Sequence, residues 1–244
     1  MSRTIRYRQI ADELRARLQN DEFAPGDLLP SESELGAAHQ VSRVTVRRAL
    51  EQLRDEGLVD SRQGFGWFRA TAPVAQNLAA LSTLEAQLIA SGKRSERRVL
   101  AFAYVKAPPS VAEVLGTEDV LEVKRCHLAD GQPFARVTVW CPAELAHDLS
   151  RNDVVAAPFV DLLGVEVAGA RQRIGAVGAD DADARLLRVP PGSPLLRATR
   201  TTFDREGRPV LFAEHVFAAH MTEFVADLPY EPAAWAPAGL RLVE

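Results

Sequence analysis

The stretch VSRVTVRRALEQLRDEGLV, residues 41–59, has the pattern of an amphipathic helix with a positively charged start. Ser42 is placed to cap the first free amides of such a helix, and Gly57 is typical of the position just after a helix end. The apolar residues recur at helical spacing and form one stripe, at Val46, Ala49 or Leu50, and Leu53. This stripe predicts a helix that packs on its neighbours and leaves its arginines exposed.

Two further helices are predicted before this stretch. The first has an apolar residue every four positions, at Ile10, Leu14 and Leu18. It is expected to end before Pro25 and Gly26, which predict a turn. The second begins at Ser31, which stands three residues before Glu34 in the spacing of a capping box.

The sequence that follows, LVDSRQGFGWFRA (58–70), alternates around Gly64 and Gly66. This pattern predicts two short strands joined by a tight loop. Three helices followed by a hairpin within about 70 residues is the order of a winged helix-turn-helix. We therefore assign residues 1–70 to such a domain.

The arginines at the start of the third helix predict contact with DNA. Arg43 and Arg47 share a helix face, Arg48 lies beside them, and a recognition helix enters the major groove with this end. Arginine can bond the O6 and N7 atoms of guanine together. Hydroxyls at a helix start, here those of Ser42 and Thr45, can bond phosphate oxygens.

The hairpin is expected to add a minor-groove contact, because Gly64 lets the backbone approach closely and Arg62 supplies charge. The alternative is that the helix arginines are ordinary surface residues paired with Glu51 and Asp55. The order of the elements favours DNA. Because one such module binds weakly, we expect a homodimer on a pseudo-palindromic site.

The overall charge excludes a general attraction to nucleic acid. The 244 residues have a formal net charge of -4, and residues 1–70 contain 11 arginines against 11 acidic residues. DNA contact must therefore come from a local patch. No apolar run approaches the roughly 18 to 20 residues of a membrane span, and no signal peptide is evident, so we expect a cytoplasmic protein. Cys126 and Cys141 are spaced unlike metal ligands, and neither a metal nor another cofactor is expected.

The rest of the chain is interpreted as a linker, residues 71–80, and a second domain, residues 81–244. Two segments of this domain each offer a short helix, a glycine turn, a strand, a Gly-x-Pro turn and another strand. Gly116 and Gly192 are 76 residues apart, as are Gly131 and Gly207, so the two copies stay in register. The pattern predicts an antiparallel sheet covered by helices on one face, and an α+β fold for the whole chain.

The first hairpin of this domain places two polar side chains on an apolar face. Asp130 and Gly131 predict a three-residue loop with a type I turn. The predicted face contains Leu121, Val123, Arg125, His127, Ala135, Val137, Val139 and Cys141. Because an unpaired buried arginine is costly, Arg125 should meet either Glu214 or an anionic ligand. His127 by itself is more often an ordinary core histidine.

The segment STLEAQLIASG (82–92) predicts a second anion-binding feature. Ser82 stands three residues before Glu85, so a helix is expected to begin there, and helix N-termini attract anions. Ser82 and Thr83 would hold a phosphate or carboxylate, with Arg94 or Arg98 nearby if the chain folds back. Plain capping is the alternative for Ser82.

The segments LPSESELG, VSRVTVRRALEQLRDEGLV and RQGFG, taken together, resemble the GntR family of bacterial transcription regulators from about residue 7 to residue 69. This resemblance implies a dimeric winged-helix repressor or activator. It implies DNA contacts at Arg43, Thr45, Arg47 and Gly64, with Ser33 near the start of the second helix.

Residues 78–228 resemble the UTRA domain of the HutC subfamily, which is similar to the chorismate lyase fold. The segments that resemble it are STLEAQLIASGK, KRCHLADGQPF and GSPLLRATRTTFDREGRPVLFAEH. The resemblance implies effector contacts at Ser82, Thr83, Arg125, His127, Glu214 and His220. We therefore predict a ligand-responsive transcription regulator, a repressor that binds a pseudo-palindromic operator as a dimer and whose DNA affinity is modulated by a small anionic metabolite. The alternatives are a chorismate-lyase-like enzyme, for which no catalytic motif is evident, and a DNA-binding protein without a ligand.

Overall fold

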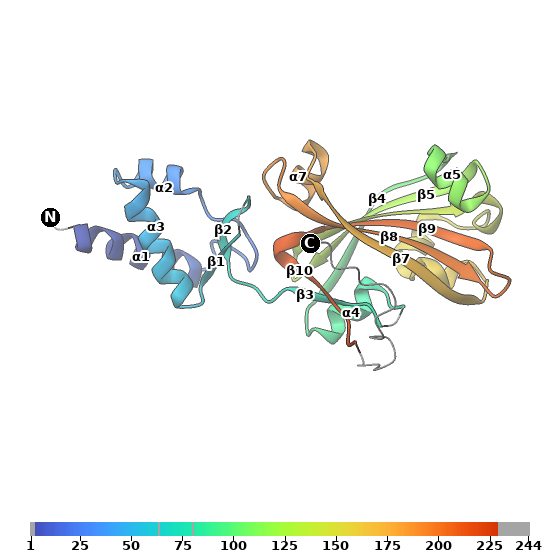
Figure 1. The fold of residues 1–244 in the computed structure, drawn as a ribbon, viewed down its shortest axis with the longest axis horizontal. Helices are drawn as coiled ribbons and strands as arrows, with labels where there is room; N and C mark the ends of the chain where they lie inside the picture. The colour runs from blue at the N-terminus through green and yellow to red at the C-terminus, as the bar shows by residue number, and fades with distance from the viewer. Residues whose placement is uncertain (1–2, 63, 80, 229–244) are drawn as a thin grey trace, which may run out of the picture.

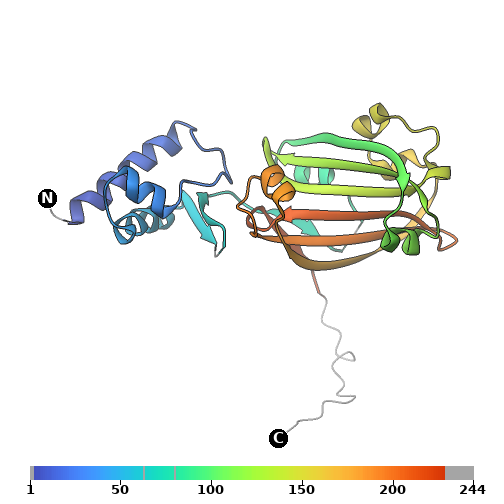
Figure 2. The ribbon, with the colours of Figure 1, turned by 90° about the horizontal axis from the view of Figure 1, so that it is seen from above.

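Three helices and a two-stranded hairpin form the N-terminal part of the molecule, in the predicted order (Figure 1). The computed structural model describes residues 3–62, 64–79 and 81–228; residues 229–244 of the second predicted domain, and Gln63 in the hairpin, lie outside them. The elements of this part are α1 (Arg3–Gln19), α2 (Glu32–Ala38), α3 (Arg43–Asp55), β1 (Val59–Arg62) and β2 (Gly66–Arg69). The helices pack on one another, and the hairpin faces the second domain (Figures 1 and 2).

The predicted caps and core of these helices are confirmed. Ser31 caps α2 in a complete capping box, in which its Oγ accepts the Glu34 amide at 3.2 Å. Ser42 caps α3, where its Oγ accepts the Thr45 amide at 3.3 Å. The predicted apolar stripes all lie in one buried cluster, formed by Ile10, Ala11, Leu14, Leu18, Val46, Ala49, Leu50 and Leu53. The local sequence therefore determines this part of the fold.

The segment predicted as a linker contains a strand, β3 (Val74–Asn77). It pairs in parallel with β10 (Thr222–Val225), so the beginning and the end of the described second domain lie side by side. Val74 and Gln76 are buried. The pairing joins residues about 150 positions apart, and such a long-range partner cannot be recognised from the weak local pattern.

The second domain is built on a six-stranded antiparallel sheet in the order β4-β5-β6-β9-β8-β7. The strands are β4 (Ser95–Lys106), β5 (Asp119–Ala129), β6 (Gln132–Pro142), β7 (Val167–Gly178), β8 (Pro194–Asp204) and β9 (Pro209–Ala218). The predicted duplication is visible in this order. The first copy contributes β4, β5 and β6, the second contributes β7, β8 and β9 in the reverse direction across the sheet, and the last strands of the two copies, β6 and β9, pair at the centre. Each copy has its helix between its first two strands, α5 (Pro109–Leu115) and α7 (Asp181–Leu187). The C-caps of the two helices differ. Gly116 caps α5 as the glycine pattern predicts, whereas Arg188, and not Gly192, caps α7.

The prediction of helices on one face only is wrong, because helices cover both faces of the sheet (Figure 2). On one face α5 packs against Trp140 and Phe212, and α7 lies over Arg136. The other face is covered by α4 (Leu84–Ala90), by α6 (Arg151–Ala156) and by the 3-10 turn Phe159–Leu162. The duplicated units account only for α5 and α7, whereas α4 and α6 lie outside them. None of the helices in the described residues has the length and hydrophobicity of a bilayer span.

The turn of the first hairpin also differs from the prediction. Asp130 and Gly131 both have positive φ, 52° and 83°, which makes a two-residue loop of type I′. Such a loop alone would place odd-numbered residues of β5 opposite even-numbered residues of β6. A bulge at Phe134 adds one residue, and the register becomes Arg125 opposite Val137 and His127 opposite Ala135. The predicted face is therefore confirmed, although the turn that produces it is different.

We predict that Ser31→Ala lowers the free energy of unfolding by about 1 kcal/mol, because it leaves the N-terminal amides of α2 without their acceptor. Urea denaturation followed by circular dichroism measures the change. Ser33→Ala is the matched control, since Ser33 is exposed on the same helix. Equal effects of the two substitutions would contradict the role of the cap.

Candidate functional site

The exposed face of α3 carries the arginines predicted to contact DNA. Arg43 is exposed, and the Arg47 side chain is 62% exposed. Arg47 is paired, but not with Glu51 or Asp55: its Nε and Nη2 donate to the two carboxylate oxygens of Glu32, each at 2.8 Å. The hydrogen bond from Arg47 holds the pKa of Glu32 below its usual value. This bidentate pair joins α2 to α3 and presents the guanidinium group at the surface.

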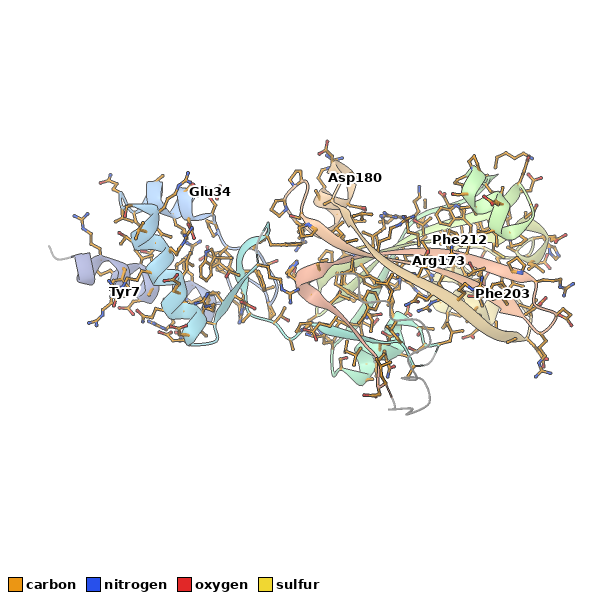
Figure 3. All side chains as sticks on the ribbon, in the orientation of Figure 1. Tyr7, Glu34, Arg173, Asp180, Phe203 and Phe212 are labelled. Carbon is orange, nitrogen blue, oxygen red and sulfur yellow. The ribbon has the colours of Figure 1, made fainter. Side chains whose placement is uncertain are left out.

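The other predicted residues of this region differ in accessibility. Arg48 is exposed and its guanidinium lies 4.5 Å from the centre of the Tyr7 ring, in a cation–π contact. Ser33 is exposed near the start of α2, next to Glu34, which Figure 3 labels there. Thr45 is only 9% exposed, and its hydroxyl lies 2.9 Å from that of Ser42. The Thr45 hydroxyl is therefore engaged in the cap of α3.

The hairpin residues predicted to enter the minor groove lie against the second domain. A guanidinium nitrogen of Arg62 donates to the carbonyl of Ala219. The carbonyl of Gly64 accepts a bond from the Ser193 hydroxyl at 3.4 Å. In this arrangement the Arg62 guanidinium and the Gly64 carbonyl contact protein, although Gly64 as a whole is exposed.

The second predicted site lies on the sheet face under α4 and α6. Side chains alternate between the two faces of a pleated strand, so every second residue of each strand lies on this face. One row of neighbours crosses three strands, from Arg125 on β5 through Val137 on β6 to His215 on β9. The next strand, β8, contributes Arg200 and Thr202 to the same face.

These side chains form the floor of a cavity of about 480 Å³. Its walls come from the start of α4, from the segment 158–167 and from β4. The wall residues are Leu81, Ser82, Thr83, Leu84, Glu85, Arg97, Pro158, Phe159, Val160, Asp161, Gly164, Val165 and Val167. The volume is within the range of small-molecule sites.

Arg125 is the most desolvated charge in this cavity. It is 6% exposed, and its Nε has no hydrogen-bond partner among the described residues. Burial lowers the pKa of Arg125 to about 10; Arg97 adds repulsion, and Glu85 opposes the shift. Glu85 is itself bound by Arg97 at 3.1 Å. The group most costly to bury is therefore left without a full counter-charge.

A second guanidinium group, that of Arg200, has neutral partners. Its Nε donates to the Gln172 side chain at 2.8 Å, and its Nη1 contacts the Ser82 carbonyl at 3.4 Å. Burial lowers the pKa of Arg200 as well. The cavity thus contains one buried and one half-buried guanidinium group without a carboxylate bound to them, which is a suitable environment for an anion.

The two histidines of the cavity are neutral at pH 7. Burial lowers the pKa of His127 and of His215 to about 3, and neighbouring arginines repel the protonated forms. The Nδ1 atom of His127 lies 3.6 Å from Glu85, which is too long for a hydrogen bond. Both nitrogens of His127 and the Nδ1 of His215 have no partner among the described residues. Neutral rings with free nitrogens can donate to or accept from a polar ligand.

Four of the six predicted effector residues line the cavity: Ser82, Thr83, Arg125 and His127. The helix start differs from the prediction, since Thr83, not Ser82, caps α4, and the Ser82 hydroxyl accepts a bond from Gln87 at 2.6 Å. Near α4 the guanidinium is that of Arg97, whereas Arg94 and Arg98 do not line the cavity.

Glu214 and His220 lie elsewhere. Glu214 is on the opposite face of the sheet, where it binds Arg136 and Arg197 at 3.3 and 2.7 Å, so the alternative pair between Arg125 and Glu214 is wrong. His220 follows β9 and contacts the N-terminal domain, its Nε2 lying 3.2 Å from the Gly26 carbonyl. His215, one residue beyond Glu214, lines the cavity and was not predicted to do so. Only the register of the β6–β9 pair decides which of the two faces the cavity.

No group of three or more side chains that could hold a metal ion occurs within the described ranges. What the cavity offers is fixed positive charge, neutral imidazoles and an apolar wall. This combination is suited to binding a ligand.

Comparison with known proteins connects both sites to one family. Residues 6–68 match the family model described as bacterial regulatory proteins, gntR family, and residues 90–223 match the UTRA domain. The chain is 33% identical to the HTH-type transcriptional regulator Rv0792c of Mycobacterium tuberculosis, over 91% of this chain and 85% of that protein. It is 27% identical to the HTH-type transcriptional repressor NagR of Bacillus subtilis, over 90% of this chain and 93% of that protein.

Solved structures have the same fold. The crystal structure of PhnF from Mycobacterium smegmatis superimposes with a TM-score of 0.60 at 23% identity, and covers 91% of this chain and 99% of that chain. Because the two family models match in the same order as the two domains seen here, the chain belongs to the GntR family of bacterial transcription regulators, with a C-terminal UTRA domain.

Proposed function

We propose that this regulator is a repressor that binds a pseudo-palindromic operator as a homodimer, and that a small anionic metabolite in the UTRA cavity controls its DNA affinity. Residues 1–70 would be the DNA-binding domain and 81–244 the effector and dimerisation domain, joined by 71–80. Repression is supported by the relative NagR, which is named as a repressor.

The observation that carries the anionic ligand is the position of Arg125. Its guanidinium is almost fully desolvated and lacks a full partner, a state that is costly unless an anion neutralises it. Arg200 is the second cation without a bound carboxylate, while Ser82, Thr83 and the neutral histidines supply hydrogen-bonding groups. A carboxylate, phosphate or phosphonate would be bound by these groups.

The other part of the ligand would meet an apolar wall. This wall is formed by Val137, Val139, Pro158, Phe159, Val160 and Leu211. A purely polar molecule would leave part of the cavity unfavourably solvated, because apolar surface gains from being removed from water. We therefore propose an effector with one anionic end and a less polar body.

The DNA contacts are proposed at Arg43, Arg47 and Arg48, with phosphate contacts from Ser33 and Ser42. Arg47 holds its fork at the surface through Glu32, and this pre-organised geometry suits a bidentate contact with guanine. Thr45 is proposed to act through the cap of α3, because its hydroxyl is bonded to that of Ser42. Arg62 and Gly64 would reach DNA only after the hairpin leaves the second domain.

A homodimer is proposed because one recognition helix offers few base contacts, and a twofold mate doubles them on a symmetric site. The experiment that tests the whole proposal is selection of bound fragments from a random DNA pool, with and without a panel of sugar phosphates, phosphonates and dicarboxylates. A symmetric motif whose recovery changes with one of these anions is the expected result. A motif without symmetry would exclude the dimer, and recovery unaffected by every anion would exclude an anionic effector of these classes.

We predict that Arg47→Ala weakens binding to the selected DNA fragment by about 1 to 3 kcal/mol, because a bidentate base contact is lost. Fluorescence anisotropy on the selected and on a scrambled fragment measures the difference. Arg54→Ala is the matched control, since Arg54 lies at the far end of α3 and contacts Trp67. An equal loss on both fragments would show that Arg47 contacts phosphate and does not read bases.

We predict that Arg125→Met raises the free energy of unfolding of the ligand-free protein by about 1 to 3 kcal/mol, because it removes an unpaired buried charge and keeps the volume filled. The same substitution should abolish the thermal shift that an anionic ligand produces in the wild type. Arg98→Met, on the exposed opposite side of the neighbouring strand, should change neither quantity. A less stable Arg125→Met protein would indicate that Arg125 has a structural role and would count against the ligand site.

We predict that the neutral histidines make the protein less stable in mild acid. His215 has a folded-state pKa of about 3, below its unfolded value, so the unfolded state takes up a proton first as the pH falls below about 6.5. At pH 5 this costs about 2 kcal/mol relative to pH 7. His215→Gln should remove this part of the pH dependence in urea titrations, whereas His147→Gln, at an exposed histidine, should retain it. Equal pH profiles for wild type and His215→Gln would contradict the burial of a neutral ring.

A further inference from the structure

The hairpin β1–β2 is held against the UTRA domain by an interface that the DNA-binding proposal does not explain. Phe65 in this hairpin is 3% exposed and belongs to the hydrophobic cluster of the second domain, together with Val74 and Met221. Trp67, two residues later, packs instead in the cluster of the N-terminal domain. The hairpin therefore contributes Phe65 to the cluster of the second domain and Trp67 to that of the first, and the interface has an apolar centre.

His220 lies at this centre. Its ring centroid is 4.9 Å from that of Phe65 and 5.0 Å from that of Phe68. Its Nε2 lies 3.2 Å from the carbonyl of Gly26, in the turn after α1. One side chain of the UTRA domain thus contacts two separate segments of the N-terminal domain, and it is buried at 3% exposure.

Polar contacts surround the aromatic group. Arg62 donates to the Ala219 carbonyl, and the Ser193 hydroxyl lies 3.4 Å from the carbonyl of Gly64. A Cβ atom placed on Gly64 would lie 3.4 Å from the Pro194 ring, in ordinary van der Waals contact, so the hairpin loop lies directly beside the start of β8. Arg62 and Gly64 are the two hairpin residues proposed for the minor groove. Here the Arg62 guanidinium and the Gly64 carbonyl contact the second domain, although Gly64 as a whole is exposed.

The UTRA side of this interface is directly connected to the cavity. Strand β9 carries His215 in the cavity and leads, five residues later, to His220. Strand β8 begins at Pro194 beside Gly64 and carries Arg200 in the cavity. A shift of either strand on ligand binding would therefore move a group that holds the hairpin.

We propose that this interface is an autoinhibitory latch, formed by Arg62, Gly64 and Phe65 on one side and by residues 193–194 and 219–221 on the other. When the latch is closed, it withholds the hairpin from the minor groove, and binding of operator DNA requires it to open. The proposal rests on the DNA-binding function proposed above. It adds a regulatory contact between the two domains, separate from the DNA contacts proposed on α3.

The test weakens the latch from the UTRA side, so that no residue proposed to touch DNA is changed. His220→Ala removes the ring that Phe65 and Phe68 contact. Ser193→Ala/Pro194→Ala, which leaves the aromatic centre intact, is a second and milder variant in case the first does not fold. Hydrogen–deuterium exchange of the full chain measures how often the hairpin opens. Fluorescence anisotropy on the selected DNA fragment measures the effect on DNA affinity.

In both variants we expect faster exchange over residues 59–69, with unchanged exchange over α3. We also expect DNA binding without effector to be about three- to tenfold tighter, because the open population is no longer a minority. His147→Ala, at an exposed histidine of the same domain, should match the wild type in both measurements.

Three outcomes would overturn the latch. Wild-type exchange in both variants would show that the hairpin is held by other contacts. Faster exchange with unchanged or weaker DNA binding would show that the interface does not inhibit. If no DNA fragment is selected at all, the DNA-binding proposal fails, while the exchange measurement still decides whether His220 holds the hairpin.

Discussion

The constraint on which the second domain depends is the desolvation of Arg125. Arg125 is only 6% exposed, so water cannot compensate its charge, and Glu85, the acid that acts on its pKa, is already bound by Arg97. The surrounding strands add further arginines and neutral histidines, and none of these supplies the missing negative charge. A fold that retains such a group loses stability, and a family whose function is to respond to a metabolite gives a physical reason for retaining it.

The alternation of side chains along the strands explains both what the sequence could predict and where prediction ended. The face of the first hairpin was predicted residue by residue, from Leu121 to Cys141, because the two strands are adjacent in the chain and joined by a short turn. The turn type was wrong, yet the bulge at Phe134 restored the same face. The loop is one residue shorter than predicted and the bulge adds one residue, so the two differences cancel and the residues of the cavity floor are the same.

The same rule failed at β9, because its partner β6 lies about 75 residues away in the chain. Without the register of that pair, Glu214 and His215 are equally good candidates for the face that Arg125 occupies, and the acidic residue was the more attractive partner. The β3–β10 pair was missed for a similar reason. By contrast, the caps at Ser31 and Ser42 and the stripes of α1 and α3 depend on residues within one helix turn, and these were confirmed. The contacts of His220 with Phe65 and Gly26 depend on how two domains meet, which no local pattern encodes.

The pairing of β3 with β10 limits the reach of the DNA-binding domain. The amide of Ala70 is still bonded to Leu58 in the N-terminal domain, and β3 begins at Val74, so residues 71–73 connect the two domains, with the Thr71 hydroxyl 3.5 Å from the Lys93 ammonium of the second. Fully extended, this tether spans about 14 Å, which is less than half of the roughly 34 Å turn of a DNA duplex. In the proposed homodimer, the distance between the two β3 strands would therefore limit the separation of the two recognition helices. The spacing between the two half-sites in the bound DNA would then depend on the geometry of the sheet domains. An insertion of a few residues after Ala70 would weaken this dependence.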